Sequence, residues 1–344
     1  MELSIVIPTF NRSAFLELTL KSIVEQQIET RSFEVIVIDN GSTDATEIVC
    51  KKFRTLIKNF IYHYDDEPGQ LTGRHKGTEL SCAGIISFID DDVELNPKWI
   101  DSIIAVFDAN LSVSIVGGPC LPKYQQYPPS WVKNFWEPTP YGGVMCLPLS
   151  LIDIGAESLE IDPLYVFGLN YSIRKDVLLK LGGFHPDCIP KDLQKFQGDG
   201  ETGLSLKAKS SNIKALYTSA AFLYHQVAAD RLTSAYFEKW YYYNGVCQSF
   251  TDIRSAFKLN GTKPDATFNI QKRLYQKVSK VNEIVKRAVR RKDVNVSPEI
   301  VRMQSIFSIR YKEGYQFHQH HFKTDSRVRD WVLKDDYWNY KIPG

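Results

Sequence analysis

The chain of 344 residues is predicted to fold as an α/β protein with a mostly parallel central sheet, followed by a mainly helical C-terminal region. Short apolar runs at residues 3–7, 33–38, 60–64 and 85–89 alternate with helix-like segments, as in consecutive βαβ units. The first two runs begin about thirty residues apart, which is the length of one such unit with parallel strands. Acidic residues follow two of these runs, where α/β sheets usually bind their ligands.

The first strand and helix follow from local signals. Residues 3–7 form a short apolar run that ends at Pro8, as expected for a strand that is buried on both faces. A helix is expected next, because Leu16, Leu20 and Ile23 fall on one stripe.

Two later helices have start signals. Asp44 stands three residues before Glu47, which is capping-box spacing, so the second helix is expected to begin at Asp44. Asn96 and Pro97 suit the cap and first position of another helix, which carries Trp99.

Composition excludes several classes of protein. The net charge of +2 does not suit a nucleic-acid binder, so no nucleic-acid partner is expected. The first strand leaves no room for a secretory signal, and no apolar run is long enough to span a membrane. The six cysteines form no Cys-x-x-Cys pair, which indicates reduced thiols rather than disulfides or a zinc site. We therefore expect a cytoplasmic protein.

Three predicted strands end in residues that suit a ligand site with a metal ion. The triplet Asp-Asp-Asp at 90–92 follows the fourth run, Asp39 ends the second, and Pro8 and Thr9 follow the first. Because the carboxyl ends of parallel strands meet at one sheet edge, these residues are expected to share a crevice. Carboxylates together with diphosphate oxygens are ligands that Mg²⁺ and Mn²⁺ prefer. The alternative is that the triplet forms a solvated turn.

Several motifs resemble the nucleotide-binding half of family 2 glycosyltransferases with the GT-A fold. They are IVIPTFNR at 5–12, VIDNGSTD at 37–44 and FIDDD at 88–92, and the likeness continues with FGLNYSIR at 167–174 and LGGF at 181–184. The resemblance implies a GT-A-like nucleotide-binding layer. It also implies a metal-dependent inverting transferase that moves one sugar from a nucleotide-diphosphate-sugar, with UDP as the first candidate, to a saccharide or lipid-linked hydroxyl. The chain lacks the Gln-x-x-Arg-Trp signature of processive members.

The resemblance also implies roles for single positions. Asp39 would read the edge of the nucleobase, Asp92 would hold Mn²⁺ or Mg²⁺, and His225 completes the metal site in some members. Arg74 would help to place the diphosphate-sugar, and His75 stands where the family usually has asparagine. The other donor-binding positions implied are Pro8, Thr9, Asn11, Asp90 and Asp91.

The catalytic base has two candidates. Transfer with inversion requires a carboxylate that accepts the proton of the acceptor hydroxyl. Alignment on Thr202 and Leu204 puts Glu201 at the family's base position, and Asp199 is the alternative; either could instead cap the following helix. The segment GDGETG at 198–203 also matches Gly-x-Gly-x-x-Gly, but no buried strand precedes it and its two carboxylates would repel a pyrophosphate, so a dinucleotide site is rejected.

We expect three parts in the chain. Residues 1–120 form the nucleotide-sugar-binding half, 121–230 the acceptor-binding and catalytic half of the same domain, and 231–344 a mainly helical extension. An aromatic stretch at 123–136 either contacts a sugar or packs on itself. Most aromatic residues of a predicted helix over 235–250 are expected in the core.

Two C-terminal segments remain. A basic helix over residues 272–292 either contacts the inner face of a membrane peripherally or presents a solvated basic face. The His-Gln-His-His run at 318–321 is interpreted as a solvated segment.

Two other functions stay open at this point. The chain could be a catalytically silent module that binds a nucleotide-sugar or a glycan, because its base motif departs from the usual acidic pair. A nucleotidyltransferase would require a Gly-rich basic loop after the first strand, and residues 8–12 do not form one.

Overall fold

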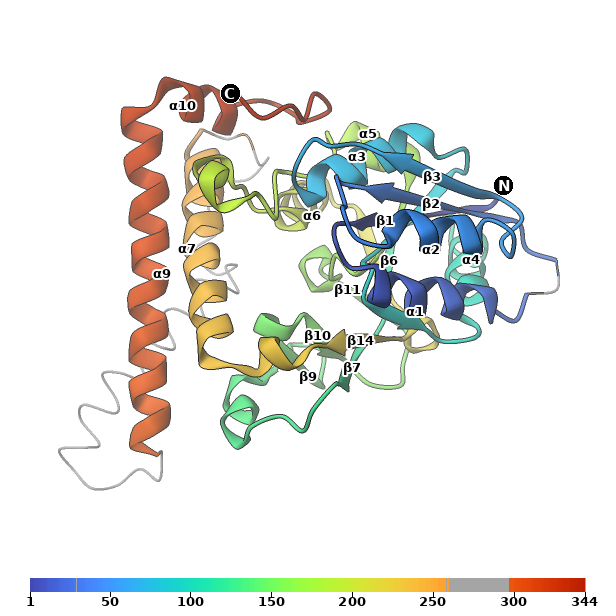
Figure 1. Ribbon diagram of the computed structural model, residues 1–344, viewed down its shortest axis with the longest axis horizontal. Coiled ribbons are helices and arrows are strands. Elements are labelled where there is room, and N and C mark those ends of the chain that lie inside the picture. The colour runs from blue at the N-terminus through green and yellow to red at the C-terminus, as the bar shows by residue number, and fades with distance from the viewer. Residues whose placement is uncertain (29, 258, 260–296, 344) are drawn as a thin grey trace.

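The computed structural model describes residues 1–28, 30–257, 259 and 297–343. At its centre lies a sheet of eight strands in the order β11-β13-β6-β12-β4-β1-β2-β3 (Figure 1). The bounds of these strands are β1 Leu3–Thr9, β2 Phe33–Asp39, β3 Phe60–Tyr64, β4 Ile85–Ile89, β6 Val113–Gly117, β11 Leu159–Ile161, β12 Asn170–Arg174 and β13 Lys214–Tyr217. Strands β4, β1, β2 and β3 are parallel neighbours, β12 is antiparallel to β4 and β6, and β11 is antiparallel to β13.

Helices accompany this sheet, as the alternating pattern predicts. They are α1 Ser13–Val24, α2 Thr46–Phe53, α3 Gln70–Leu80, α4 Trp99–Ala109, α5 Lys175–Lys180 and α6 Glu201–Ser210. The predicted α/β fold with a mostly parallel sheet is therefore confirmed.

A second, smaller sheet lies below the first in Figure 1 and has the order β5-β14-β7-β10-β9-β8. Its strands are β5 Val93–Leu95, β7 Cys120–Tyr124, β8 Glu137–Pro138, β9 Val144–Cys146, β10 Leu151–Asp153 and β14 Leu223–Val227. Strand β5 begins directly after the acidic triplet and pairs with β14, His225 lying opposite Val93. This pairing brings His225, from the end of the α/β region, close to the acidic triplet.

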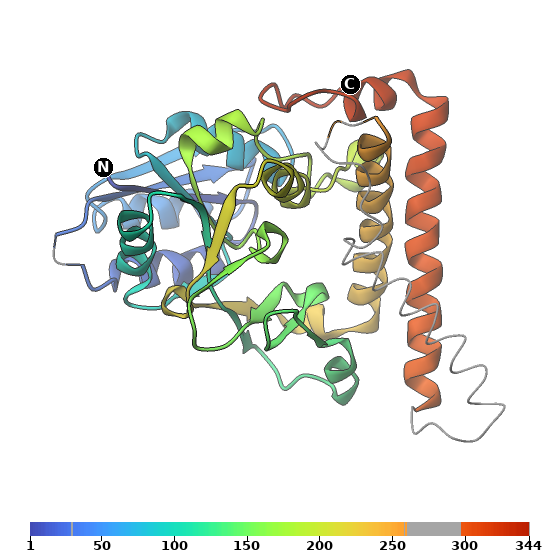
Figure 2. The same cartoon turned by 180° about the vertical axis from the view of Figure 1, so that it is seen from behind.

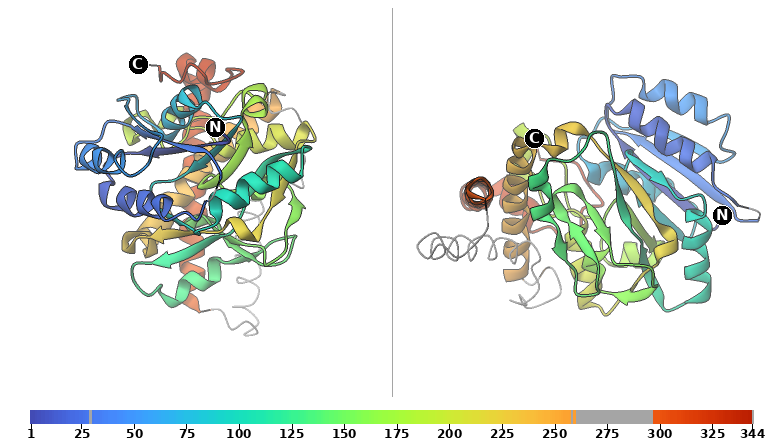
Figure 3. Two further views of the ribbon diagram at one scale, coloured as in Figure 1. Left: turned by 90° about the vertical axis from the view of Figure 1, so that its right-hand side faces the viewer. Right: turned by 90° about the horizontal axis from the view of Figure 1, so that it is seen from below.

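The helical C-terminal region is also confirmed. Helices α7 (Ser234–Ala256) and α9 (Pro298–Thr324) lie side by side, away from the main sheet, and α10 (Ser326–Val332) turns the chain back toward it (Figures 1 and 2). The two long helices approach closely at Gly245, where an added Cβ would lie 2.0 Å from the carbonyl oxygen of Tyr311. Seen from below, α9 lies outside α7 relative to the sheets (Figure 3).

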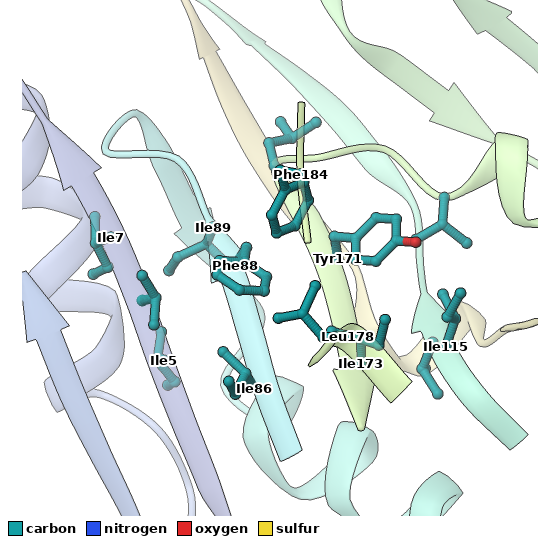
Figure 4. Close-up of a cluster of buried hydrophobic side chains, with 14 of the residues drawn as sticks. Ile5, Ile7, Ile86, Phe88, Ile89, Ile115, Tyr171, Ile173, Leu178 and Phe184 are labelled. Atoms are coloured by element: carbon teal, nitrogen blue, oxygen red, sulfur yellow. The ribbon is translucent and has the colours of Figure 1, made fainter. Parts of the chain in front are cut away.

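The main core fills the space around strands β1, β4 and β12. Figure 4 shows Phe88 of β4, Tyr171 of β12 and Phe184 gathered in this core. The rings of Phe88 and Phe184 meet edge to face at 4.8 Å between centroids. A second core cluster contains Phe135 together with aromatic residues of α7 and α9, and Trp131 packs against it. The aromatic stretch at 123–136 therefore contributes to packing.

Both predicted helix caps are displaced. Helix α2 has Ala45 at its cap position, while the Asp44 carboxylate accepts hydrogen bonds from the backbone N–H groups of Thr46 and Ser13. Asp44 thus joins the starts of α1 and α2. Capping-box spacing concerns only neighbouring residues, so it does not predict the contact with Ser13. Helix α4 begins two residues later than expected, with Lys98 at its cap.

Three expectations about the C-terminal region need correction or lie outside the described residues. His318 is buried in α9, so the interpretation of residues 318–321 as a solvated segment is wrong for this residue. On α7, Phe237, Tyr241 and Phe250 are buried as expected, whereas Tyr236, Trp240 and Tyr243 are only half-buried. The proposed basic helix over 272–292 lies outside the described residues. None of the helices within the described ranges combines the length and apolarity that a membrane span requires.

Candidate active site

The acidic triplet lies between β4 and β5 and is held by residues at the end of β1. The Thr9 hydroxyl donates to Asp91 Oδ2 at 2.7 Å, and Arg12 Nε lies 2.9 Å from Asp91 Oδ1. Burial raises the pKa of Asp91 to about 7, although Arg12 opposes this shift. Asp91 therefore anchors the triplet to β1, and its two neighbours are directed elsewhere.

Asp92 is buried and is surrounded by cationic and imidazole groups. Its Oδ2 lies 3.0 Å from Arg231 Nη2 and 3.4 Å from His225 Nε2, and it also accepts from Arg12 Nη2. Although burial alone would raise it, the interactions with His225, Arg231 and Arg12 hold the pKa of Asp92 below its usual range. The carboxylate is therefore charged at neutral pH.

The tautomer of His225 follows from its hydrogen bonds. Its Nδ1 lies 2.8 Å from the carbonyl oxygen of Leu149, and a carbonyl can only accept, so Nδ1 carries the proton. In the neutral ring, Nε2 then has a free lone pair, which accepts from Arg231 Nη1 at 2.7 Å. An imidazole nitrogen with a free lone pair and a neighbouring carboxylate commonly bind a metal ion together.

The chemistry of these donors fits a divalent cation. Asp92 Oδ1 is buried and has no hydrogen-bond partner among the described residues. Those residues contain no group of three or more His, Cys, Asp or Glu side chains arranged to hold a metal. A cation held by Asp92 and His225 would thus take its other ligands from a diphosphate and water, as Mg²⁺ and Mn²⁺ commonly do.

Arg74 and Glu201 meet across the sheet edge. Arg74, on α3, is almost fully buried; its Nη1 lies 3.3 Å from Glu201 Oε2 and its Nη2 lies 3.8 Å from Asp90 Oδ1. Gly168 makes this approach possible, because a Cβ there would lie 2.6 Å from Arg74 Nη2 and 2.9 Å from Glu201 Cδ. Gln70 Nε2 donates to Asp90 Oδ1 at 2.7 Å. Together these contacts form one polar cluster at the carboxyl end of β4, made of Gln70, Arg74, Asp90 and Glu201.

The two base candidates have different surroundings. Glu201 is partly exposed at the first position of α6, and Asp199 is buried. Asp199 Oδ1 lies 2.6 Å from His185 Nδ1, and its Oδ2 accepts from the Thr251 hydroxyl at 2.6 Å. Although burial opposes it, these two contacts hold the pKa of Asp199 below its usual value. Asp199 thus joins the α6 region to α7, whereas Glu201 has an oxygen available to a substrate.

The residues expected at the nucleobase lie at the neighbouring strand end. Asp39 is buried at the end of β2, opposite Thr9 in the β1–β2 pairing. Its oxygens accept from the Ser42 N–H and from the Tyr62 hydroxyl, each at 2.8 Å. Asn11, in a left-handed conformation with φ 53°, accepts the Thr43 N–H with its Oδ1. The loops after β1 and β2 are therefore joined into one surface.

His75 has a structural position. Its Nδ1 lies 2.9 Å from the carbonyl oxygen of Tyr337, which requires Nδ1–H, and its Nε2 accepts from the Phe184 N–H. Burial lowers the pKa of His75 to about 3, so the ring is neutral, and Trp338 stacks on it. His75 thus connects α3, the loop before Phe184 and the C-terminal segment.

One large cavity is lined by some of these groups, among them Arg74, Asp90 and Glu201. It has a volume of about 1140 Å³ and lies between the sheet-edge residues Arg74, Asp90 and Glu201 and one face of α7. Asp39 and Asn11 are not among the described residues that line it. The cavity therefore adjoins the position expected for a sugar and diphosphate rather than that of a nucleobase.

Sequence reasoning missed several residues of this site. Arg12 belongs to a quoted motif but received no role, and Arg231 follows β14 in a segment without any motif. Asp187 lines the cavity, and its enclosure and the nearby Glu201 raise its pKa to about 6. Its position shortly after the Gly-Gly-Phe segment was the available signal for Asp187. The contacts of Arg231 depend on the return of β14 to β5, which no local pattern predicts.

The chain is similar to known proteins in both sequence and structure. The family model described as "Glycosyl transferase family 2" matches residues 4–153. Validoxylamine A glucosyltransferase of Streptomyces hygroscopicus subsp. jinggangensis is 27% identical over 199 residues, which cover 54% of this chain and 47% of that protein. Glucosyl-dolichyl phosphate glucuronosyltransferase of Haloferax volcanii is 25% identical over 186 residues, which cover 54% of this chain and 56% of that protein. The chain spans about half the length of these curated relatives.

Among solved structures, a mannosyltransferase from Pyrobaculum calidifontis, in complex with GDP-Man and Mn²⁺, aligns with a TM-score of 0.49. Its sequence is 14% identical, and the alignment covers 98% of this chain and 85% of that one.

Proposed function

We propose that this chain, whose residues 4–153 match the family model of glycosyl transferase family 2, is a metal-dependent inverting glycosyltransferase. It moves a single sugar from a nucleotide-diphosphate-sugar to a hydroxyl of a saccharide or lipid-linked acceptor. The observation that carries this proposal is the convergence of Asp90, Arg74 and Glu201 on one cavity, beside the Asp92 and His225 pair.

The donor would lie across the ends of β1, β2 and β4. Asp39 and Asn11, with the Pro8 and Thr9 backbone, would form the nucleobase side, and Asp90 and Asp91 would flank the ribose. UDP is the first candidate for the nucleotide. The buried Arg74 guanidinium suits the diphosphate, because a cation in a low-dielectric site attracts phosphate charge strongly.

Asp92 and His225 would hold Mn²⁺ or Mg²⁺, which when bound neutralises charge on the leaving diphosphate. The remaining chemistry belongs to the side chains. Glu201 accepts the proton of the acceptor hydroxyl, whose oxygen bonds to the anomeric carbon from the side opposite the diphosphate, while the bond from that carbon to the diphosphate oxygen breaks. Arg74, 3.3 Å from Glu201 Oε2, orients this carboxylate.

Asp199 suits the base role less well than Glu201. Both of its oxygens accept hydrogen bonds from buried groups, so proton transfer from an acceptor would require the loss of those bonds.

The test combines binding and turnover. Calorimetric titration with UDP, GDP and TDP, with and without Mn²⁺, should give binding of one nucleotide that requires the metal and is lost in Asp92→Asn. Glu201→Gln should keep that binding and lower turnover at least 100-fold, because the amide cannot accept the proton. Asp39→Asn is a second variant that should change the choice of nucleobase without abolishing the metal requirement.

A silent binding module is the competing function. It would bind the nucleotide-sugar with the same metal requirement, but neither hydrolyse nor transfer the sugar over hours. Nucleotide binding that is the same with and without Mn²⁺, and in the wild type and Asp92→Asn, would contradict the metal assignment.

A further inference from the structure

One face of α7 lines the cavity opposite the sheet edge. Its cavity-facing positions recur every three or four residues, which is the spacing of one helix face. From the first aromatic residue to Thr251 this face has a length of about 22 Å, at about 1.5 Å per residue. This face carries Tyr236, Trp240, Tyr243, Asn244, Gln248 and Thr251.

The opposite side of α7 is occupied by α9. Gly245 meets the backbone of Tyr311, and the Ser249 hydroxyl lies 2.7 Å from His318 Nδ1. The helix therefore has one packed side and one side that faces the cavity.

Two buried amide oxygens on the cavity face have no hydrogen-bond donor in the described part of the chain. Asn244 is 8% exposed and Gln248 is 2% exposed, and neither Asn244 Oδ1 nor Gln248 Oε1 has a hydrogen-bond partner among the residues that the structure describes. Their nitrogens are engaged, since Asn244 Nδ2 donates to the Trp240 carbonyl and Gln248 Nε2 donates to Asp252 Oδ1 at 2.7 Å. The oxygens thus remain directed away from these partners, and a buried acceptor without a donor is unfavourable.

Aromatic rings line the same cavity as these two amide side chains. Tyr236, Trp240 and Tyr243 are half-buried and line the same cavity. An aromatic face packs on the C–H face of a sugar ring, and an amide oxygen accepts from its hydroxyl groups. A lipid chain would supply no donor to the two oxygens.

Each end of this face contacts a residue next to a group of the proposed active site. The Arg231 guanidinium, which contacts Asp92, lies 6.0 Å from the centre of the Tyr236 ring. At the other end, the Thr251 hydroxyl donates to Asp199, two residues before Glu201. A molecule along α7 would therefore lie beside the reacting groups.

From these observations, and on the premise of the proposed function, we propose that the cavity face of α7 binds the acceptor and that the acceptor is an oligosaccharide of several sugar rings. Trp240 and its aromatic neighbours stack on the rings, and Asn244 and Gln248 accept hydrogen bonds from their hydroxyl groups. Because the face is longer than one sugar ring, specificity depends on more than the terminal sugar.

The experiment uses the full chain and an array of immobilised oligosaccharides. The wild type should bind a defined group of glycans on the array. Trp240→Ala and Gln248→Leu should each weaken binding to the best of these at least tenfold, and Trp240→Phe should restore most of it. The matched control is Glu238→Gln on the same helix, because Glu238 pairs with Arg310 of α9 and does not line the cavity.

Nucleotide binding and nucleotide-sugar hydrolysis, measured on the same preparations, separate the two proposals. Retained nucleotide binding in the variants shows that they are folded. If the wild type hydrolyses a nucleotide-sugar but binds no glycan, or if both cavity variants bind glycans like the wild type, this inference is overturned and the proposed function stands. If glycan binding depends on Trp240 and Gln248 but no nucleotide binds, the proposed function fails and α7 remains a glycan-binding surface.

Discussion

Two carboxylates only two residues apart have different environments at the start of α6. Asp199 has both oxygens engaged by His185 and Thr251, and Glu201 has one contact with Arg74 beside the cavity. Sequence alignment favoured Glu201 but left Asp199 open, because the partners of Asp199 come from segments 14 and 52 residues away. The spacing of residues within a motif does not predict contacts with such distant segments.

Stability measurements should separate the two residues. Asp199→Ala removes the acceptor of two buried hydrogen bonds, so the free energy of unfolding should fall by about 2 kcal/mol. Glu201→Ala, at a partly exposed position, should change it by less than about 0.5 kcal/mol. Urea denaturation of both variants measures the difference; equal losses would mean that Glu201 also has a structural role.

Arg231 should compete with a metal ion for Asp92. Its guanidinium contacts both Asp92 Oδ2 and His225 Nε2, the two groups assigned to the metal. Arg231→Gln removes this positive charge, so the affinity for Mn²⁺ without nucleotide should rise several-fold. Calorimetry with Mn²⁺ alone measures it, and Lys239→Gln serves as a control for a general loss of charge from the cavity. Unchanged or weaker Mn²⁺ binding in Arg231→Gln would contradict the assignment.

At the scale of elements, apolar periodicity predicted most strands well. Residues 60–64 and 85–89 form β3 and β4 with the bounds expected. The small second sheet was not predicted, because its strands are short and have too few residues for a periodic pattern. The helix starts near Asp44 and Asn96 were misplaced because tertiary hydrogen bonds and the local turn determine them.

The crossing of α7 and α9 depends on Gly245. Because a Cβ there would lie 2.0 Å from the Tyr311 carbonyl oxygen, Gly245→Ala should force the helices apart and lower the free energy of unfolding by about 1–3 kcal/mol. Gly84→Ala is the control, since nothing lies within 4 Å of the Cβ it would add. Thermal unfolding of the two variants provides the comparison, and similar stabilities would mean that the crossing adapts at little cost.

At the scale of the whole molecule, the sequence predicted which strand ends lie together, but it did not predict the cavity beside them. Residues after β1, β2 and β4 are neighbours because parallel strands place them at one edge. The cavity could not be predicted, because α7, Arg231 and Asp187 reach it through packing between distant segments. The same limit applied to His318, whose burial depends on the contact between α9 and α7.

Buried neutral histidines should make the fold sensitive to acid. Burial lowers the pKa of His75 to about 3 and that of His318 to about 4, against an ordinary value of 6.5. Between these values the unfolded chain binds more protons than the folded one, so stability is complete above pH 6.5 and falls as the pH decreases below it. Each histidine should lower the free energy of unfolding by about 2 kcal/mol when the pH falls from 7.5 to 5.

Chemical denaturation at the two pH values measures this loss. His318→Asn should reduce the pH dependence, whereas His320→Asn, at an exposed position on the same helix, should leave it unchanged. An equal pH dependence in both variants would show that His318 does not titrate on unfolding.

The hydrogen bond from His75 to Tyr337 joins residues 262 positions apart, and Tyr340 and Ile342 make further bonds to Asp65 and Glu67. Such contacts raise the contact order, and closing so long a loop is entropically costly. The helix that carries Arg74 should therefore reach its final position only in the last stage of folding. In refolding experiments we expect secondary structure to return before the ability to bind a nucleotide does.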